Sequence, residues 1–169
     1  IEVDLGEIGE ICLAGPVIMK GYLNNEAATN EIIEVDEKGV RWVHTGDLGY
    51  MDEDGVIFYV QRLKRMLIVS GYNVYPTHIE ETIMSHPDVA NCGVIGVPHP
   101  YKVQVPKAFI VLKDGVELDS KVRNSIKEHC KKNLAVYMMP KEFEFRESLP
   151  KTLVGKVNYK ELEKEMKQD

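Results

Sequence analysis

The sequence lacks the features that mark secreted, disulfide-bonded or membrane-spanning proteins. Its 169 residues include only three cysteines, Cys12, Cys92 and Cys130, and none lies close to another. An odd number of widely spaced cysteines argues against a disulfide framework and against a thiolate metal site, and it favours a reducing, cytoplasmic compartment. No apolar run approaches the roughly 18 to 20 residues of a membrane helix, and the N-terminus has neither a basic start nor an apolar core. We therefore expect a soluble chain without a transmembrane segment or signal peptide, and the initial Ile indicates a piece of a longer protein.

Common catalytic and metal-binding motifs are also missing. There is no GxSxG elbow and no HExxH motif, and the five histidines lie too far apart in sequence to suggest a shared set of metal ligands. The GK pair at 155–156 is not a Walker motif, because Pro150 stands where a P-loop needs glycine. An EF-hand at the acidic turn 52–55 would place Tyr50 and Gln61 at positions that need oxygen-rich acidic ligands. We therefore predict a hairpin turn at 52–55 and no metal site.

Charge divides the chain into two parts. Residues 1–60 hold 13 acidic and three basic side chains, a net charge of −10, whereas residues 61–169 hold 14 acidic and 18 basic ones, a net charge of +4. The lysines of the second part are interspersed with glutamates and form no dense basic stripe with interleaved aromatics, so nucleic-acid binding is not expected. The modest positive excess fits the few phosphates of a small ligand better.

The first part has the pattern of strands and turns. GEICLAGP (9–16) is a short apolar strand between glycines, and residues 41–64 predict two strands joined by the acidic turn. The second part alternates strands and helices. MLIVSGYNVYP (66–76) predicts a hairpin that pivots at Ser70 and Gly71.

A helix with a capping box from Thr77 to Glu80 is predicted to follow that hairpin. The later patterns predict strands at 89–97 and 107–112, an amphipathic helix from the N-cap candidates Asp119 and Ser120 to Leu134, a strand at 142–146 and a short last helix carrying Leu162 and Met166. Helices packed on a small sheet make residues 62–169 an α+β domain.

Three segments occur together in an order typical of one family. They are WVHTGDLGYMDEDG (42–55), QRLKRMLIVSGYNVYPTHIE (61–80) and LPKTLVGKVNY (149–159). The chain thereby resembles the C-terminal part of the adenylate-forming superfamily, and most of all its acyl-CoA synthetases, or fatty-acid–CoA ligases. The resemblance implies that residues 1–61 are the β-rich end of a large N-terminal AMP-binding domain, part of its barrel subdomain. Residues 62–169 would be the mobile C-terminal cap domain.

The resemblance also implies roles for individual residues. These are Asp47 and Arg62 as ligands of the ATP ribose, Lys64 as the hinge, Ser70, Gly71 and Tyr72 as the loop lining the pantetheine tunnel, and Lys156 as the catalytic lysine. A carboxylate with two oxygens suits a ribose diol, and a lysine can stabilise charge between two anions that must react. The sequence departs from the family pattern at Gln61, at Asn73 and at 103–106.

The activity implied by the resemblance has two half-reactions. A carboxylic acid reacts with ATP and Mg²⁺ to give an acyl-adenylate and pyrophosphate, and the thiol of CoA then attacks the adenylate after the cap rotates. Because the family's phosphate loop and acyl pocket lie in an N-terminal domain, this chain alone is expected to be inactive. Two alternatives stay open, the adenylation domain of a peptide synthetase and a non-catalytic α+β module that binds a nucleotide or a partner protein. The acid, its chain length and the oligomeric state are not encoded in these residues.

Overall fold

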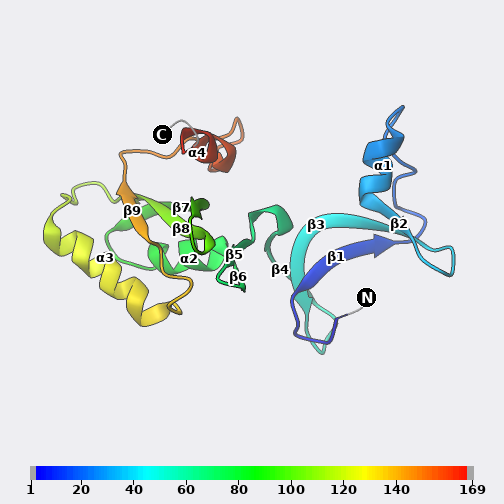
Figure 1. Cartoon of the computed structure of the whole chain (residues 1–169), viewed down its shortest axis with the longest axis horizontal. Helices are drawn as coiled ribbons and strands as arrows, with labels where there is room; N and C mark the ends of the chain where they lie inside the picture. Colours follow the sequence, from blue (N-terminus) through cyan, green and yellow to red (C-terminus); the bar gives the residue numbers. More distant parts are fainter. Residues whose placement is uncertain (1–2, 167–169) are drawn as a thin grey trace. The chain divides into compact units, whose positions relative to one another are not determined.

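The computed structural model describes residues 3–166, and the chain divides into two units, Ile1–Lys64 and Arg65–Asp169 (Figure 1). Each unit has a β-sheet of its own. Within the described residues, no helix combines the length and the apolar composition that a bilayer crossing requires.

The sheet of the first unit is built around its longest strand, β3. It pairs antiparallel with β1 along one edge and with β2 and β4 along the other. The strands are β1 (Gly9–Ala14), β2 (Ile33–Val35), β3 (Arg41–Met51) and β4 (Ile57–Arg62). The predicted turn between β3 and β4 is confirmed: the carboxylate of Asp52 accepts hydrogen bonds from the backbone N–H groups of Asp54 (3.0 Å) and Val56 (2.9 Å).

A short helix that the sequence patterns do not predict, α1 (Glu26–Ile32), precedes β2. Its N-cap is Asn25, whose side chain accepts a hydrogen bond from the backbone N–H of Ala28 at 3.0 Å. No residue of α1 is buried, so the helix has no apolar stripe from which a helical period could be read. The N-cap at Asn25 is therefore a clearer sign of this helix in the sequence than its pattern of apolar residues.

The sheet of the second unit is built around β8. Strand β7 runs antiparallel along one edge of β8, and β5 and β9 share the other edge, β9 in the parallel direction. The strands are β5 (Leu67–Val69), β6 (Tyr72–Val74), β7 (Val89–His99), β8 (Val103–Leu112) and β9 (Glu142–Phe145). The predicted α+β class is confirmed, and so is the hairpin at Ser70 and Gly71, which joins β5 to β6.

Both faces of this second sheet are covered, because alternate residues of β8 point to opposite sides. Ala108 and Ile110 lie in a buried cluster with side chains of α2 and α3, whereas Phe109 lies in another cluster with Leu162 of α4. The helices are α2 (Pro76–Met84), α3 (Ser120–Asn133) and α4 (Tyr159–Glu165). The predicted amphipathic helix is confirmed, with Asp119 as its N-cap and with Ile126 and Cys130 buried.

The capping box predicted from Thr77 to Glu80 is wrong. Helix α2 begins at Pro76, and its N-cap is Tyr75, which makes no side-chain capping hydrogen bond. Proline suits the first position of a helix, because its missing N–H would have no partner inside the helix there. Glu80 lies a full turn into the helix and is buried, and its carboxylate pairs with Arg65 instead of capping the helix.

His86, just after α2, is buried in its neutral form. Its side chain is 4% exposed, its Nδ1 accepts a hydrogen bond from the backbone N–H of Asp88 at 3.2 Å, and its Nε2 lies 2.9 Å from the hydroxyl oxygen of Ser125. Burial lowers the pKa of His86; His129 and Lys113 lower it further, and the carboxylate of Asp88 opposes them. Since Nδ1 is the acceptor, the proton of the neutral ring is on Nε2 and is donated to Ser125.

We predict that stability falls on acidification because His86 must take up a proton. Its pKa in the folded state lies below that in the unfolded state, so its contribution is complete above the unfolded value and is lost as the pH falls through the folded value. Urea unfolding between about pH 7.5 and about pH 5 should show a declining free energy of unfolding, and His86→Gln should flatten the decline. His78→Gln, at an exposed position, should keep the wild-type slope. A wild-type slope in His86→Gln would contradict the prediction.

Candidate functional site

The first group of predicted site residues lies on the paired strands β3 and β4. Asp47 and Arg62 stand directly opposite each other in the register, and Arg62 Nε lies 2.7 Å from Asp47 Oδ1. The arginine side chain is 63% exposed and the aspartate 28% exposed, although Asp47 Oδ1 itself is buried. The structure therefore brings together the two residues predicted to hold the ribose, which lie fifteen positions apart in the sequence.

The backbone before Asp47 is held in a specific shape. Gly46 has a φ of 70°, a left-handed conformation that favours glycine, and its N–H donates to Oε1 of Glu10 at 2.9 Å. The hydroxyl of Thr45 donates to the carbonyl of Ile11 at 2.7 Å and accepts a hydrogen bond from the N–H of Asp47 at 3.1 Å. These bonds to β1 fix the direction in which Asp47 leaves the strand.

Lys64 lies in a single 3₁₀ turn, Leu63–Arg65, and is the last residue of the first unit. The residue predicted as the hinge thus falls at the junction between the units. Gln61, three residues before Lys64, is one of the positions at which the sequence departs from the family pattern. Its side chain is completely buried, and its backbone pairs with Leu48 of β3.

Ser70 and Gly71 form the tight turn between β5 and β6. Both have positive φ values, 53° and 86°, as the two central residues of a type I′ hairpin turn require. A Cβ on Gly71 would meet no atom within 4 Å, so the glycine is needed for its conformation and leaves open space above the turn. Tyr72 follows and stacks on Tyr137, with 4.4 Å between the ring centroids.

Lys156 lies in a small hairpin between β9 and α4. The hairpin closes through hydrogen bonds from Thr152 N to Lys156 O (2.7 Å) and from Gly155 N to Thr152 O (2.9 Å), and Gly155 has a φ of 81°. Its base is anchored by Leu149, which is buried in the cluster that contains Leu162. The lysine side chain is exposed on this anchored loop, and it can therefore reach a ligand without unfolding the domain.

One group that the sequence patterns do not reveal is a buried ion pair in the second unit. Arg65 Nη2 lies 2.6 Å from Glu80 Oε1, and their side chains are 23% and 6% exposed. The same carboxylate oxygen accepts the N–H of Val94 in β7 at 2.8 Å, and the Arg65 guanidinium lies 3.7 Å from the ring centroid of Tyr159. Burial raises the pKa of Glu80, an effect that Arg65 and the hydrogen bonds from Val94 and Tyr159 oppose. This network joins the start of the second unit to α2, to the sheet and to α4.

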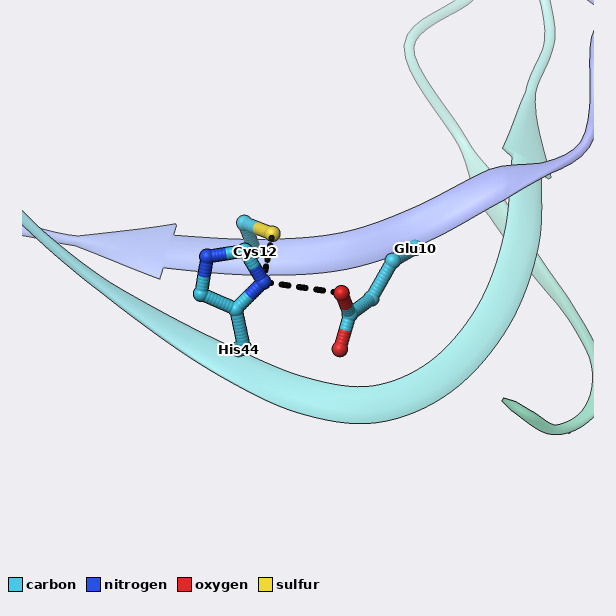
Figure 2. A group of neighbouring side chains, drawn as sticks. All are labelled: Glu10, Cys12 and His44. Carbon is cyan, nitrogen blue, oxygen red and sulfur yellow. Dashed lines mark hydrogen bonds and ion pairs between the residues drawn. The ribbon is translucent and has the colours of Figure 1, made fainter. Parts of the chain in front are cut away.

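A second unanticipated group lies in the first unit, where Glu10, Cys12 and His44 meet (Figure 2). His44 Nδ1 lies 2.8 Å from Glu10 Oε2 and 3.6 Å from Cys12 Sγ. The hydrogen bond to Glu10 is the main reason that the pKa of His44 is raised, and burial, with the charges of Glu10 and Glu34, raises that of Cys12. Within the described residues these three groups are the ones placed so as to share a metal ion.

Comparison with known families finds a match within the second unit. The family model described as the AMP-binding enzyme C-terminal domain matches residues 78–156, from α2 to the lysine of the small hairpin. The similarity to this family covers residues 78–156, a little under half of the chain. The resemblance to adenylate-forming enzymes drawn from the three motifs is thereby confirmed.

Relatives extend the similarity over nearly the whole chain. A long-chain-fatty-acid–CoA ligase from Salmonella typhimurium (strain LT2) is 43% identical over 164 residues, 97% of this chain and 28% of that protein. The ATP-bound structure of MatB from Rhodopseudomonas palustris has a TM-score of 0.85 at 33% identity, covering 98% of this chain and 31% of that one. The o-succinylbenzoate CoA synthetase from Bacillus subtilis, in complex with its acyl-adenylate intermediate, has a TM-score of 0.78 at 34% identity, covering 95% of this chain and 31% of that one. The chain thus spans less than a third of the length of each of these relatives.

We predict that the second unit depends on the Arg65–Glu80 pair for stability. Glu80→Ala leaves the Arg65 guanidinium and the Val94 N–H without their acceptor, and it should lower the free energy of unfolding by about 3 kcal/mol in urea titrations. Glu80→Gln retains an acceptor and should cost less. As a matched control, Glu128→Ala removes an exposed helical pair with Lys131 and should leave the transition unchanged. Equal midpoints for Glu80→Ala and Glu128→Ala would contradict the prediction.

Proposed function

We propose that this chain is the C-terminal part of an ATP-dependent acyl-CoA synthetase, an acid–thiol ligase that forms an acyl-adenylate and then an acyl-CoA. The observation that carries the proposal is the 43% identity with a long-chain-fatty-acid–CoA ligase across 97% of the chain. The ATP in one related structure and the acyl-adenylate in another support ATP and the adenylate as ligands. The acyl pocket and most of the ATP site would lie outside these 169 residues, so the chain alone should form no adenylate.

The nucleotide contact is proposed at Asp47 and Arg62. The Asp47 carboxylate would accept hydrogen bonds from the two ribose hydroxyls. Arg62, held 2.7 Å from that carboxylate, has further N–H donors on its planar guanidinium with which to meet the ribose oxygens. Both side chains are partly exposed on paired strands, as contact with a ligand requires.

Lys156 is proposed to act in the first half-reaction. A carboxylate oxygen of the acid attacks the α-phosphorus of ATP, the bond to pyrophosphate breaks, and negative charge builds up between the two reacting anions. An ammonium group positioned there stabilises this charge. Mg²⁺ would enter as the counter-ion of ATP, part of the substrate, and we assign it no ligand in this chain.

The turn at Ser70, Gly71 and Tyr72 is proposed to act in the second half-reaction. The thiolate sulfur of CoA attacks the acyl carbonyl carbon, and AMP leaves with the electrons of the mixed-anhydride bond. Open space above Gly71 lets a thin pantetheine arm pass close to the backbone. The exchange between half-reactions would be a rotation of the second unit about Lys64, where the chain passes from one unit to the other. We accordingly propose residues 1–61 as the end of the AMP-binding domain and residues 62–169 as the mobile cap.

A fatty acid is the proposed substrate, because the relative that is 43% identical is a long-chain-fatty-acid–CoA ligase. A relative that acts on o-succinylbenzoate has the same fold, so the acid must be tested directly. The three cysteines are free thiols, which supports the cytoplasm as the compartment. The adenylation domain of a peptide synthetase is the competing proposal, and it would transfer the acyl group to a carrier-protein thiol in place of CoA.

We predict that Lys156→Ala, in the complete enzyme, slows adenylation by about 10²-fold or more, since removing one group that stabilises developing negative charge has that effect. Pyrophosphate release with a panel of fatty acids measures this step. Thioester formation from supplied acyl-adenylate should change little, because Lys156 has no role after the adenylate exists. Lys160→Ala, an exposed lysine of α4, should behave as wild type in both steps. Equal damage to both half-reactions by Lys156→Ala, at unchanged thermal stability, would overturn the assignment.

We predict that Lys64→Pro, in the complete enzyme, impairs thioester formation more than adenylation. Proline fixes φ near −65° and also restricts Leu63, so the backbone cannot absorb the rotation between half-reactions. Lys64→Ala tests the side chain separately and should be near wild type in both steps, because the proposed role belongs to the backbone. If Lys64→Pro slowed both steps equally, the hinge would have to be placed elsewhere.

A further inference from the structure

The Glu10, Cys12 and His44 group is formed by the antiparallel pairing of β1 with β3. Cys12 and His44 are direct partners in the register, and Glu10 lies two positions before Cys12, with a β-bulge between them. Figure 2 shows the three side chains turned toward one another between the two strands. A sulfur, an imidazole nitrogen and a carboxylate oxygen thereby lie within 4.8 Å of one another.

We propose that these three residues form a binding site for Zn²⁺, with Cys12 Sγ, His44 Nδ1 and Glu10 Oε2 as its ligands. Bonds of about 2.3 Å to sulfur and about 2.05 Å to nitrogen, arranged tetrahedrally, place those two atoms about 3.6 Å apart. The separation in the structure is 3.6 Å. The carboxylate oxygen lies 2.8 Å from the nitrogen, against about 3.4 Å for the corresponding tetrahedral edge, and a Glu10 oxygen lies within 4.8 Å of the sulfur, so the Glu10 carboxylate must shift when the ion binds.

The surroundings of the three residues are those of a metal site. His44 Nε2, the nitrogen that would not bind the ion, lies 3.0 Å from Oε2 of Glu34. A carboxylate on that nitrogen orients the ring and increases the basicity of the other nitrogen, as in many zinc proteins. The second oxygen of Glu10 is similarly held, by the N–H of Gly46 at 2.9 Å. Each of these two ligands is therefore oriented by a partner of its own.

The donor set selects the type of ion. A thiolate and an imidazole favour zinc and similar transition metals, whereas Mg²⁺ prefers oxygen ligands throughout, so this site is distinct from the Mg²⁺ that accompanies ATP. Three protein ligands leave a fourth position for water, and the side chains of His44 and Glu10 are 33% and 23% exposed. On binding, the thiol proton of Cys12 and the Nδ1 proton that His44 donates to Glu10 both pass to solvent, and the ion links β1 to β3 next to the backbone turn that carries Asp47.

Cobalt binding to the 169-residue chain tests the proposal, because Co²⁺ reports thiolate ligation through a charge-transfer absorption in the near ultraviolet. Chelator-treated protein should bind one equivalent of Co²⁺ with this absorption, and Zn²⁺ should displace it. Cys12→Ser should abolish the absorption, and His44→Gln should weaken Co²⁺ binding by more than 10-fold. Glu34→Ala should weaken it by about 10- to 100-fold, the effect expected of a residue that orients a ligand. His78→Gln, an exposed histidine of α2, should leave binding unchanged.

A second measurement needs no variant and so does not depend on the folding of one. Cys92 and Cys130 are buried, whereas Cys12 is partly exposed, so a thiol-alkylating reagent should label Cys12 first. Zn²⁺ should protect Cys12 from labelling, as read by mass spectrometry. Unchanged labelling of Cys12 in Zn²⁺, or a charge-transfer absorption that persists in Cys12→Ser, would overturn the proposal.

Discussion

The buried pair of Arg65 and Glu80 is the interaction on which the second unit depends. Arg65 is the first residue of that unit, and Glu80 lies in α2, yet one carboxylate oxygen meets both the guanidinium and the N–H of Val94 in β7. The guanidinium also covers the ring of Tyr159, the first residue of α4. A charge buried without a partner is costly, so these contacts must be kept together. They constrain four parts of the unit at once: its start, its first helix, its sheet and its last helix. The small hairpin with Lys156 ends two residues before Tyr159 and is tied to the same point.

Patterns of neighbouring residues in the sequence were enough to predict helices and turns whose conformation depends on those residues alone. The period of four between Ile126 and Cys130, behind an aspartate N-cap, identified α3, and the Ser70–Gly71 pair identified a hairpin whose turn needs two positive φ values. The capping box failed because Thr77 and Glu80 have the right spacing for one, while Pro76 already starts the helix and Glu80 bonds to residues far away in the sequence. Helix α1 escaped prediction because nothing in it is buried.

Site residues were predictable to the extent that a motif carries them. The TGD and GK segments pointed to Asp47 and Lys156, and the structure adds what no local pattern contains: the register that sets Asp47 opposite Arg62. Glu10 and Cys12 are close in the sequence on β1, with a register shift between them, but only the pairing of β1 with β3 supplies His44. Large separation between possible ligands in a sequence, such as Cys12 and His44, is thus weak evidence against a shared site in a sheet protein, where register decides which side chains meet.

The parallel pairing of β9 with β8 has a consequence for the order in which the second unit forms. Strands β7 and β8 are joined by a few residues and can pair as soon as they are made, whereas β9 can pair with β8 only after the chain has passed through α3. Closing that longer loop costs more conformational entropy, so β9 joins an already folded hairpin. We therefore expect everything after β9, including the loop with Lys156, to become ordered last.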